Sequence, residues 1–186
     1  MPTVRRSACR VSRGFTLTEL MVVVVIVGVL AAIGVMTFRK HVFSSRSVEA
    51  LAMIQSIRVA QEGWRAEHMT YLDVSTTMDS TYPMATPGKT LHHWIQSSGA
   101  DFARWQLLNP SAPNPVQFGY TTKAGPPFTA MVNPSSGAQP GWPAAAQVTE
   151  PWYVIQAKGD TNADGTFAYF VAASLNGEVF RENEGE

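Results

Sequence analysis

Cysteine is almost missing from this chain: its 186 residues include one, Cys9. One cysteine cannot close a disulfide within the chain, so the folded part must be held by core packing, with or without help from an ion. The motifs of nucleotide and acyl-transfer sites are missing too, because the sequence has no P-loop, Gly-x-Gly-x-x-Gly or Gly-x-Ser-x-Gly. The sequence therefore gives no support for an enzyme.

Proline is missing between Thr3 and Tyr82, and apart from Pro2 every proline lies between Pro83 and Pro151. Since proline breaks helices and sheets, this distribution permits one long helix and predicts irregular chain after it. Apolar residues at three- and four-residue steps extend a helical pattern beyond residue 38: Val48, Leu51, Ala52, Ile54, Ile57, Ala60 and Trp64. The sequence predicts one helix from Phe15 to about Tyr71, roughly 85 Å long.

Charged residues are almost missing from residues 15–38, which contain one, Glu19. At 1.5 Å per residue this segment makes a helix of roughly 36 Å, enough to cross a hydrocarbon core of roughly 30 Å. Residues 1–14 contain four arginines and no acid, which indicates a cytoplasmic N-terminus. A carboxylate at the centre of a membrane helix costs ~2.5–3.5 kcal/mol, so Glu19 calls for a specific role.

Two ordinary explanations of the apolar segment are a cleaved secretory signal and a plain signal anchor. A secretory signal has an apolar region of ~7–15 residues followed by an Ala-x-Ala-like cleavage site. The segment here is longer, and Leu30-Ala31-Ala32 is a poor site. A plain signal anchor has a similar hydropathy, so hydropathy alone does not exclude it. The residues at the start of the segment have to distinguish a signal anchor from other membrane segments.

The string Gly14-Phe15-Thr16-Leu17-Thr18-Glu19 resembles the type III signal of type IV prepilins and pseudopilins. The resemblance implies that a prepilin peptidase cuts after Gly14 and methylates Phe15, the new N-terminus. It also implies that Glu19 meets the N-terminal amine of an adjacent subunit and sets the axial register of a filament, because pairing reduces the cost of burying both charges. A second explanation is that the helix macrodipole favours a carboxylate at this end, which can also reach the membrane interface.

The family resemblance further implies partners and a location. The expected partners are the prepilin peptidase, other pilin or pseudopilin subunits, an inner-membrane assembly platform and membrane lipid. The expected location is the inner membrane, as a single-pass protein with a cytoplasmic N-terminus and a periplasmic head, and afterwards a pilus or periplasmic filament. Loss of the four leader arginines lowers the formal net charge from 0 to −4, so no specific nucleic-acid partner is expected.

Two departures from the family pattern favour one subtype. Met36 stands where many members have proline, and Thr18 stands where isoleucine is usual. Together with a head rich in proline and tryptophan, they favour a minor pilin of a type IV pilus, acting in assembly, motility or adhesion. A type II secretion pseudopilin, a major pilin and a membrane-tethered module that binds a surface or DNA stay open as alternatives.

The expected fold is α+β and pilin-like, with a long N-terminal helix packed on a C-terminal antiparallel sheet. The predicted segments are a cleaved leader (1–14), a transmembrane or filament-core helix (15–38), an amphipathic helix (39–72), a Pro-rich connection (73–151) and antiparallel strands (152–186). Shorter elements are expected as helices at 90–95 and 102–108 and as strands at 117–122, 152–158, 167–175 and 178–181. Asn176-Gly177 predicts a two-residue hairpin turn between the last two strands.

Residues 159–165, Gly-Asp-Thr-Asn-Ala-Asp-Gly, are the segment most like an ion-binding loop. Asp160, Asn162 and Asp164 fall at positions one, three and five of an EF-hand, but position twelve is Val171, where a bidentate glutamate is needed. The EF-hand interpretation therefore fails. A looser calcium site at these three side chains is one hypothesis, and an Asx/Gly loop joining two strands is the other.

Adjacent histidines at 92 and 93 are the other candidates for metal binding. Adjacent side chains point apart on a helix, and no cysteine or third histidine lies nearby in the sequence. A zinc site is therefore not expected, and calcium at residues 160–164 is the one cofactor considered.

Overall fold

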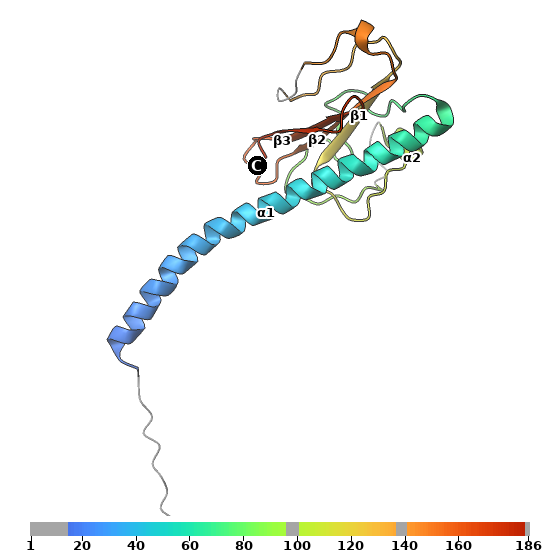
Figure 1. Ribbon diagram of the computed structural model, residues 1–186. Coiled ribbons are helices and arrows are strands. Elements are labelled where there is room, and N and C mark those ends of the chain that lie inside the picture. The colour runs from blue at the N-terminus through green and yellow to red at the C-terminus, as the bar shows by residue number, and fades with distance from the viewer. Residues whose placement is uncertain (1–14, 96–100, 137–140, 185–186) are drawn as a thin grey trace, which may run out of the picture. The chain divides into compact units, whose positions relative to one another are not determined.

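The computed structural model describes residues 15–95, 101–136 and 141–184 (Figure 1). The chain divides into two compact units, residues 1–39 and 40–186. Helix α1 (Leu17–His68) contributes residues to both units. The predicted leader, including Gly14, lies outside the described residues.

The part of α1 in the first unit is the apolar segment. Leu17–Val35 is long and apolar enough to cross a membrane, by length and composition, and none of it is buried within the chain. The backbone stays helical through Met36, because methionine keeps the N–H group that proline would remove from the helix. The long helix predicted from the proline-free region is thereby confirmed, with ends two or three residues inside the expected ones.

The C-terminal end of α1 is closed by a left-handed residue. Met69 adopts φ 61°, and its N–H donates to the carbonyl of Arg65 at 2.8 Å. This geometry satisfies one of the free carbonyl groups at a helix end, although glycine is the usual residue there. The chain then turns back along the head.

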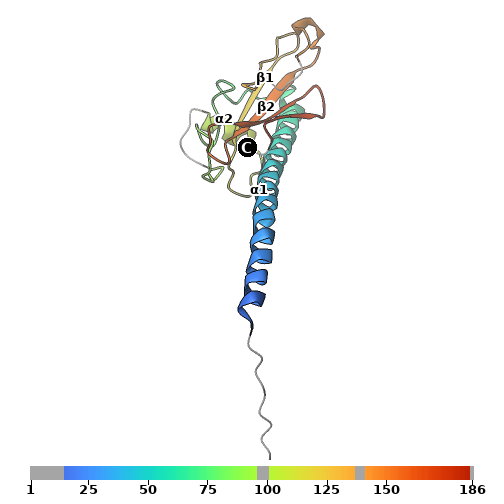
Figure 2. The same ribbon diagram turned by 90° about the vertical axis from the view of Figure 1, so that its left-hand side faces the viewer.

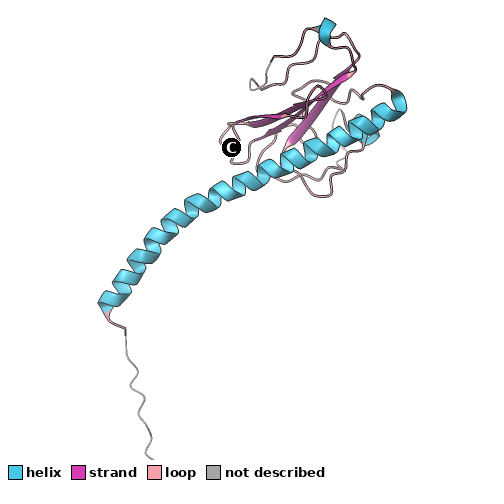
Figure 3. Cartoon of the chain, in the orientation of Figure 1, coloured by secondary structure: helices cyan, strands magenta, loops and turns pink. Residues whose placement is uncertain are grey.

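The second unit contains one antiparallel sheet in the order β1-β2-β3-β4 (Figure 3). The strands are β1 (Gly119–Gly125), β2 (Trp152–Gly159), β3 (Ala168–Ala173) and β4 (Val179–Glu182). All four predicted strands are present within about three residues of their expected bounds. Strand β1 lies inside the region 73–151, where the prolines predicted mainly irregular chain. The expected α+β arrangement is confirmed.

One face of the sheet packs on α1, which runs beside it in Figures 1 and 2. Ile54 and Ile57 of α1 are fully buried, and so are Ile155 of β2 and Phe170 of β3, all within one apolar cluster. Along each strand this cluster takes alternate residues, Tyr153, Ile155 and Ala157 from β2 and Ala168, Phe170 and Ala172 from β3, as expected where one face of a strand meets a helix. The amphipathic pattern of residues 48–64 thus forms the core of the head.

The other face of the sheet is buried as well. Trp152 and Val154 of β2 and Val171 of β3 pack with Met131 and Val148, which belong to the connection between β1 and β2. This connection includes the short 3-10 helix η1 (Ala145–Gln147). The Pro-rich chain therefore supplies a second small core in place of regular structure.

The short helix expected at 102–108 is present as α2 (Phe102–Leu108), with Trp105 and Leu108 buried. The helix expected at 90–95 is wrong, because this segment is extended and His92 forms a two-way bridge with Val116. Trp94 packs edge-on against Trp105 and its carbonyl accepts the hydroxyl of Tyr82. These contacts with distant segments outweigh the local helical preference.

The two-residue turn expected at Asn176-Gly177 is also wrong. Strand β3 ends at Ala173 and β4 begins at Val179, with Ala172 opposite Val179, so the connection has five residues. The Arg58 guanidinium of α1 donates to the carbonyls of Gly177 at 3.1 Å and Glu178 at 3.0 Å. These carbonyl groups face the helix, which explains why a tight turn does not form.

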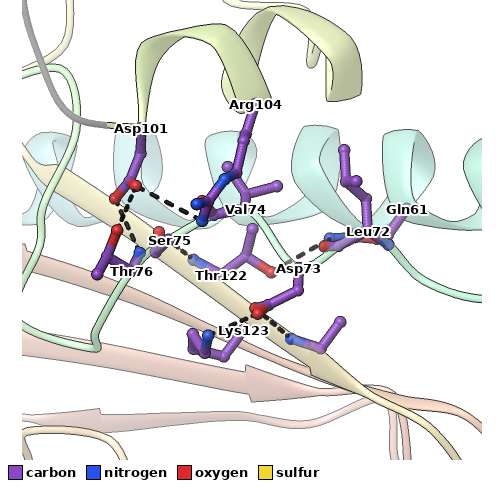
Figure 4. A network of polar contacts seen from close by, with 11 residues as sticks. Gln61, Leu72, Asp73, Val74, Ser75, Thr76, Asp101, Arg104, Thr122 and Lys123 are labelled. Atoms are coloured by element: carbon purple, nitrogen blue, oxygen red, sulfur yellow. Dashed lines mark hydrogen bonds and ion pairs between the residues drawn. The ribbon is translucent and has the colours of Figure 1, made fainter.

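A polar network fixes the segment that follows α1 (Figure 4). The fully buried Gln61 donates from Nε2 to the Leu72 carbonyl and accepts the Leu72 N–H at Oε1, both at 2.9 Å. Gln61 also donates to Thr122 Oγ1 of β1 at 3.3 Å. One helix side chain therefore holds both the returning chain and the first strand.

Candidate functional site

The residues that begin α1 form the candidate site. Thr16 is the last residue before the helix, and the carboxylate of Glu19 accepts its N–H at 2.9 Å and its hydroxyl at 2.7 Å. In return, Thr16 Oγ1 accepts the N–H of Glu19 at 3.2 Å. This reciprocal arrangement is a capping box, which satisfies two N–H groups that a helix start otherwise leaves unpaired.

The cap leaves part of the Glu19 carboxylate available. Both bonds from Thr16 end on Oε2, and among the described residues no hydrogen bond to Oε1 is present. The side chain is exposed, so Glu19 can bind a cation from another molecule without releasing Thr16. The two explanations of Glu19, a helix-end carboxylate and a partner for an amine, are therefore geometrically compatible.

The surroundings of this carboxylate are apolar. Phe15 is 80% exposed and Leu17 is 79% exposed, and the exposed helix continues to Val35. In lipid or among similar helices, where the dielectric constant is low, an opposite charge binds a carboxylate more strongly than it does in water. The predicted cleavage position Gly14 lies outside the described residues, so its role stays a prediction, as does methylation of Phe15.

Thr16 is the residue of this site that sequence reasoning missed. The signal was present, since Thr-x-x-Glu before an apolar run is the capping-box pattern.

The candidate calcium residues lie together in the loop between β2 and β3. Asp160 Oδ1 accepts the N–H of Ala163 at 2.6 Å, and Asp160 Oδ2 accepts the N–H of Gly165 at 3.1 Å. Asn162 Oδ1 accepts the N–H of Asp164 at 2.9 Å. These carboxylate and amide oxygens accept hydrogen bonds from the backbone of their own loop, which is the geometry of an Asx loop. Calcium binding at this loop stays a prediction.

His92 and His93 belong to an extended segment, and His92 pairs through its backbone with Val116. Among the described residues, no group of three or more His, Cys, Asp or Glu side chains is arranged to hold a metal ion. The described part of the chain thus concentrates its distinctive chemistry at the start of α1.

Comparison with known proteins places the same segment in a family context. Residues 9–35, which include Gly14, Phe15 and Glu19, match the model of the prokaryotic N-terminal methylation motif. The chain is 42% identical over 62 residues to the type IV major pilin protein PilA of Myxococcus xanthus, covering 33% of this chain and 28% of that protein. It is 29% identical over 82 residues to a fimbrial protein of Pseudomonas aeruginosa, covering 44% of this chain and 53% of that protein.

The matched regions span from about a quarter to about half of the length of these curated relatives. No solved structure is significantly similar to the chain. The similarity therefore lies in part of the chain, and the remainder of the head has to be interpreted from its own contacts.

Proposed function

Because the chain belongs to the type IV pilin family, we propose that it is a structural subunit of a type IV pilus-like filament, and specifically a minor pilin. The observation that carries the proposal is the start of α1. A capped carboxylate with an unused oxygen lies in the first turn of α1, within an apolar segment of 19 residues, Leu17–Val35, that is uncovered within its own chain.

The proposed sequence of events begins in the inner membrane, with the head in the periplasm. The prepilin peptidase cuts after Gly14, and Phe15 becomes a methylated, cationic N-terminus. Assembly then moves the helix from lipid to a bundle of similar helices, with little change in hydrophobic free energy because both surroundings are apolar. Pairing of Glu19 with the amine of a neighbour supplies the specificity that nonpolar contacts lack.

The minor-pilin assignment is supported by the helix and the head. The helix of this chain is unbroken at Met36, so it lacks the kink that proline gives in many family members. The connection between β1 and β2 packs its own tryptophan and methionine residues on the outer face of the sheet. We assign no catalytic step to this subunit; its partners are other subunits and the assembly platform.

Replacement of Glu19 tests the filament function. We expect Glu19→Ala to abolish recovery of the chain in sheared filaments while the membrane pool persists, because the carboxylate that selects the neighbour is gone. Glu67→Ala is the matched control, since Glu67 is an exposed glutamate near the other end of the same helix. Quantitative immunoblotting of filament and membrane fractions measures both.

Replacement of Thr16 separates capping from pairing. Loss of a threonine cap costs about 0.5–2 kcal/mol, so Thr16→Ala should reduce incorporation less than Glu19→Ala does. Undiminished incorporation of Glu19→Ala would contradict the proposal, and binding by a head that never enters filaments would favour a membrane-tethered module.

A further inference from the structure

Asn176 is the one asparagine of this chain that is followed by glycine. The other five asparagines precede proline, alanine or glutamate: Asn109, Asn114, Asn133, Asn162 and Asn183. An asparagine loses its side-chain nitrogen when the backbone nitrogen of the next residue attacks its Cγ atom, which makes asparagine a chemically labile residue. Proline has no N–H to lose, and a side chain on the next residue obstructs the approach, so glycine is the most permissive successor.

The structure leaves the Asn176 side chain free to react. It is exposed and lies in the connection between β3 and β4, and no hydrogen bond to its carboxamide is present in the described part of the chain. Two other asparagine side chains are held in place. Nδ2 of Asn162 donates to Asp164 Oδ2 at 2.9 Å, and Nδ2 of Asn183 donates to the Phe167 carbonyl at 3.2 Å.

A cation of α1 lies beside the backbone that would react. Nη2 of Arg58 is 3.5 Å from the Asn176 carbonyl oxygen, and Nη1 of Arg58 is 3.1 Å from the Gly177 carbonyl oxygen. The Gly177 nitrogen lies between these two carbonyl groups along the chain. A neighbouring positive charge favours the anionic form of a group. Arg58 therefore stabilises the negative charge that this nitrogen acquires when it loses its proton.

We propose that Asn176 is a self-modification site of the head, where Arg58 promotes deamidation. The Gly177 nitrogen gives its proton to hydroxide and forms a bond to Asn176 Cγ. The side-chain nitrogen takes a proton from water and leaves as ammonia, so the product is a five-membered succinimide. Water then adds to one of the two succinimide carbonyl carbons and breaks the bond from that carbon to nitrogen, which leaves aspartate or isoaspartate at this position.

The conversion changes the contact between this connection and α1. In isoaspartate, the former main-chain carbonyl of residue 176 becomes the free carboxylate, and the backbone gains one carbon before Gly177. The Arg58 guanidinium faces that carbonyl group, so it gains an ion-pair partner. The lengthened backbone displaces the carbonyls of Gly177 and Glu178, which Arg58 binds in the unmodified head. Because ammonia is lost, modified heads accumulate with the age of the protein.

Peptide mass spectrometry of the full chain, incubated in detergent at neutral and at mildly alkaline pH, tests the proposal. We expect residue 176 to convert before any other asparagine, and faster at the higher pH because the attacking nitrogen must lose a proton. Arg58→Gln should slow the conversion about twofold to fivefold, as expected for loss of one exposed charge interaction, and Arg58→Lys should convert faster than Arg58→Gln because the charge is kept. Arg65→Gln is the matched control, since Arg65 of the same helix binds Tyr71 and Glu150 instead, and should convert like the wild type.

The same incubation in guanidinium chloride separates the effect of Arg58 from the reactivity of the sequence itself. Unfolding parts α1 from the connection, so the wild type and Arg58→Gln should then convert at equal rates. Earlier conversion of another asparagine, or no conversion at residue 176, would overturn the site. A folded Arg58→Gln variant that converts as fast as the wild type, or a difference that persists in the unfolded chains, would overturn the role of Arg58. Thermal unfolding establishes that each variant is folded before incubation.

Discussion

Glu49 is a half-buried ionisable side chain that joins α1 to the start of the sheet. It accepts the N–H of Gln117 at 2.8 Å. Burial raises the pKa of Glu49 above its ordinary value of 4.5, against the opposing effect of the backbone N–H groups of Gln117 and Phe118. Burial also raises the pKa of Tyr120 well above its usual range, and the nearby Glu49 charge adds to this shift. Burial in the head thus disfavours the charged form of Glu49.

This raised pKa makes the stability of the head depend on pH. Between 4.5 and the higher folded pKa, the folded state binds more protons than the unfolded state, so stability falls as pH rises through that interval. Glu49→Gln keeps an acceptor oxygen and removes the charge. We expect the melting temperature of the full chain in detergent to fall less between about pH 4.5 and about pH 7 in this variant than in the wild type. Glu67→Gln, at an exposed position on the same helix, should follow the wild type, and equal slopes in all three proteins would contradict the role of Glu49.

At the scale of elements, β1 depends on a close contact with β2. A Cβ atom added at Gly125 would lie 2.6 Å from Cε2 of Trp152, and Trp152 is held in place because its Nε1 donates to Thr129 Oγ1 at 2.9 Å. Glycine is therefore required at the end of β1 for the indole ring to cover the strand.

We expect Gly125→Ala to destabilise the head by about 1–3 kcal/mol, since the added methyl group overpacks a buried ring. Gly63→Ala is the opposite control, because Gly63 is an exposed residue of α1 with nothing near its added Cβ, and alanine should gain about 0.5–1 kcal/mol there. Thermal unfolding of both variants measures whether each substitution lowers or raises the stability of the head. A neutral Gly125→Ala would show that the strand end relaxes around Trp152.

Sequence patterns predicted the elements that local periodicity controls. The long helix, α2 and all four strands follow from the spacing of apolar and β-branched residues. The helix expected at 90–95 and the tight turn at Asn176-Gly177 were wrong because distant partners decide those segments: Trp105 and Tyr82 hold Trp94, and Arg58 binds the carbonyls before β4.

At the scale of the whole molecule, the chain joins an uncovered apolar helix to a head with two small cores. The string Gly14 to Glu19 identified the candidate site from sequence alone. A single charged residue, five positions after Gly14 in an apolar segment, can be recognised without knowing the fold. The structure added Thr16 and the unused oxygen of Glu19, which depend on side-chain geometry.

Processing as a pilin changes the intact mass of the protein, which can be measured on membranes of its host. We predict a chain that begins at methylated Phe15 when the prepilin peptidase is present, and a chain that retains residues 1–14 when the peptidase is deleted. A chain that keeps residues 1–14 in the presence of the peptidase, or one that begins near Ala32 or later, would contradict the account.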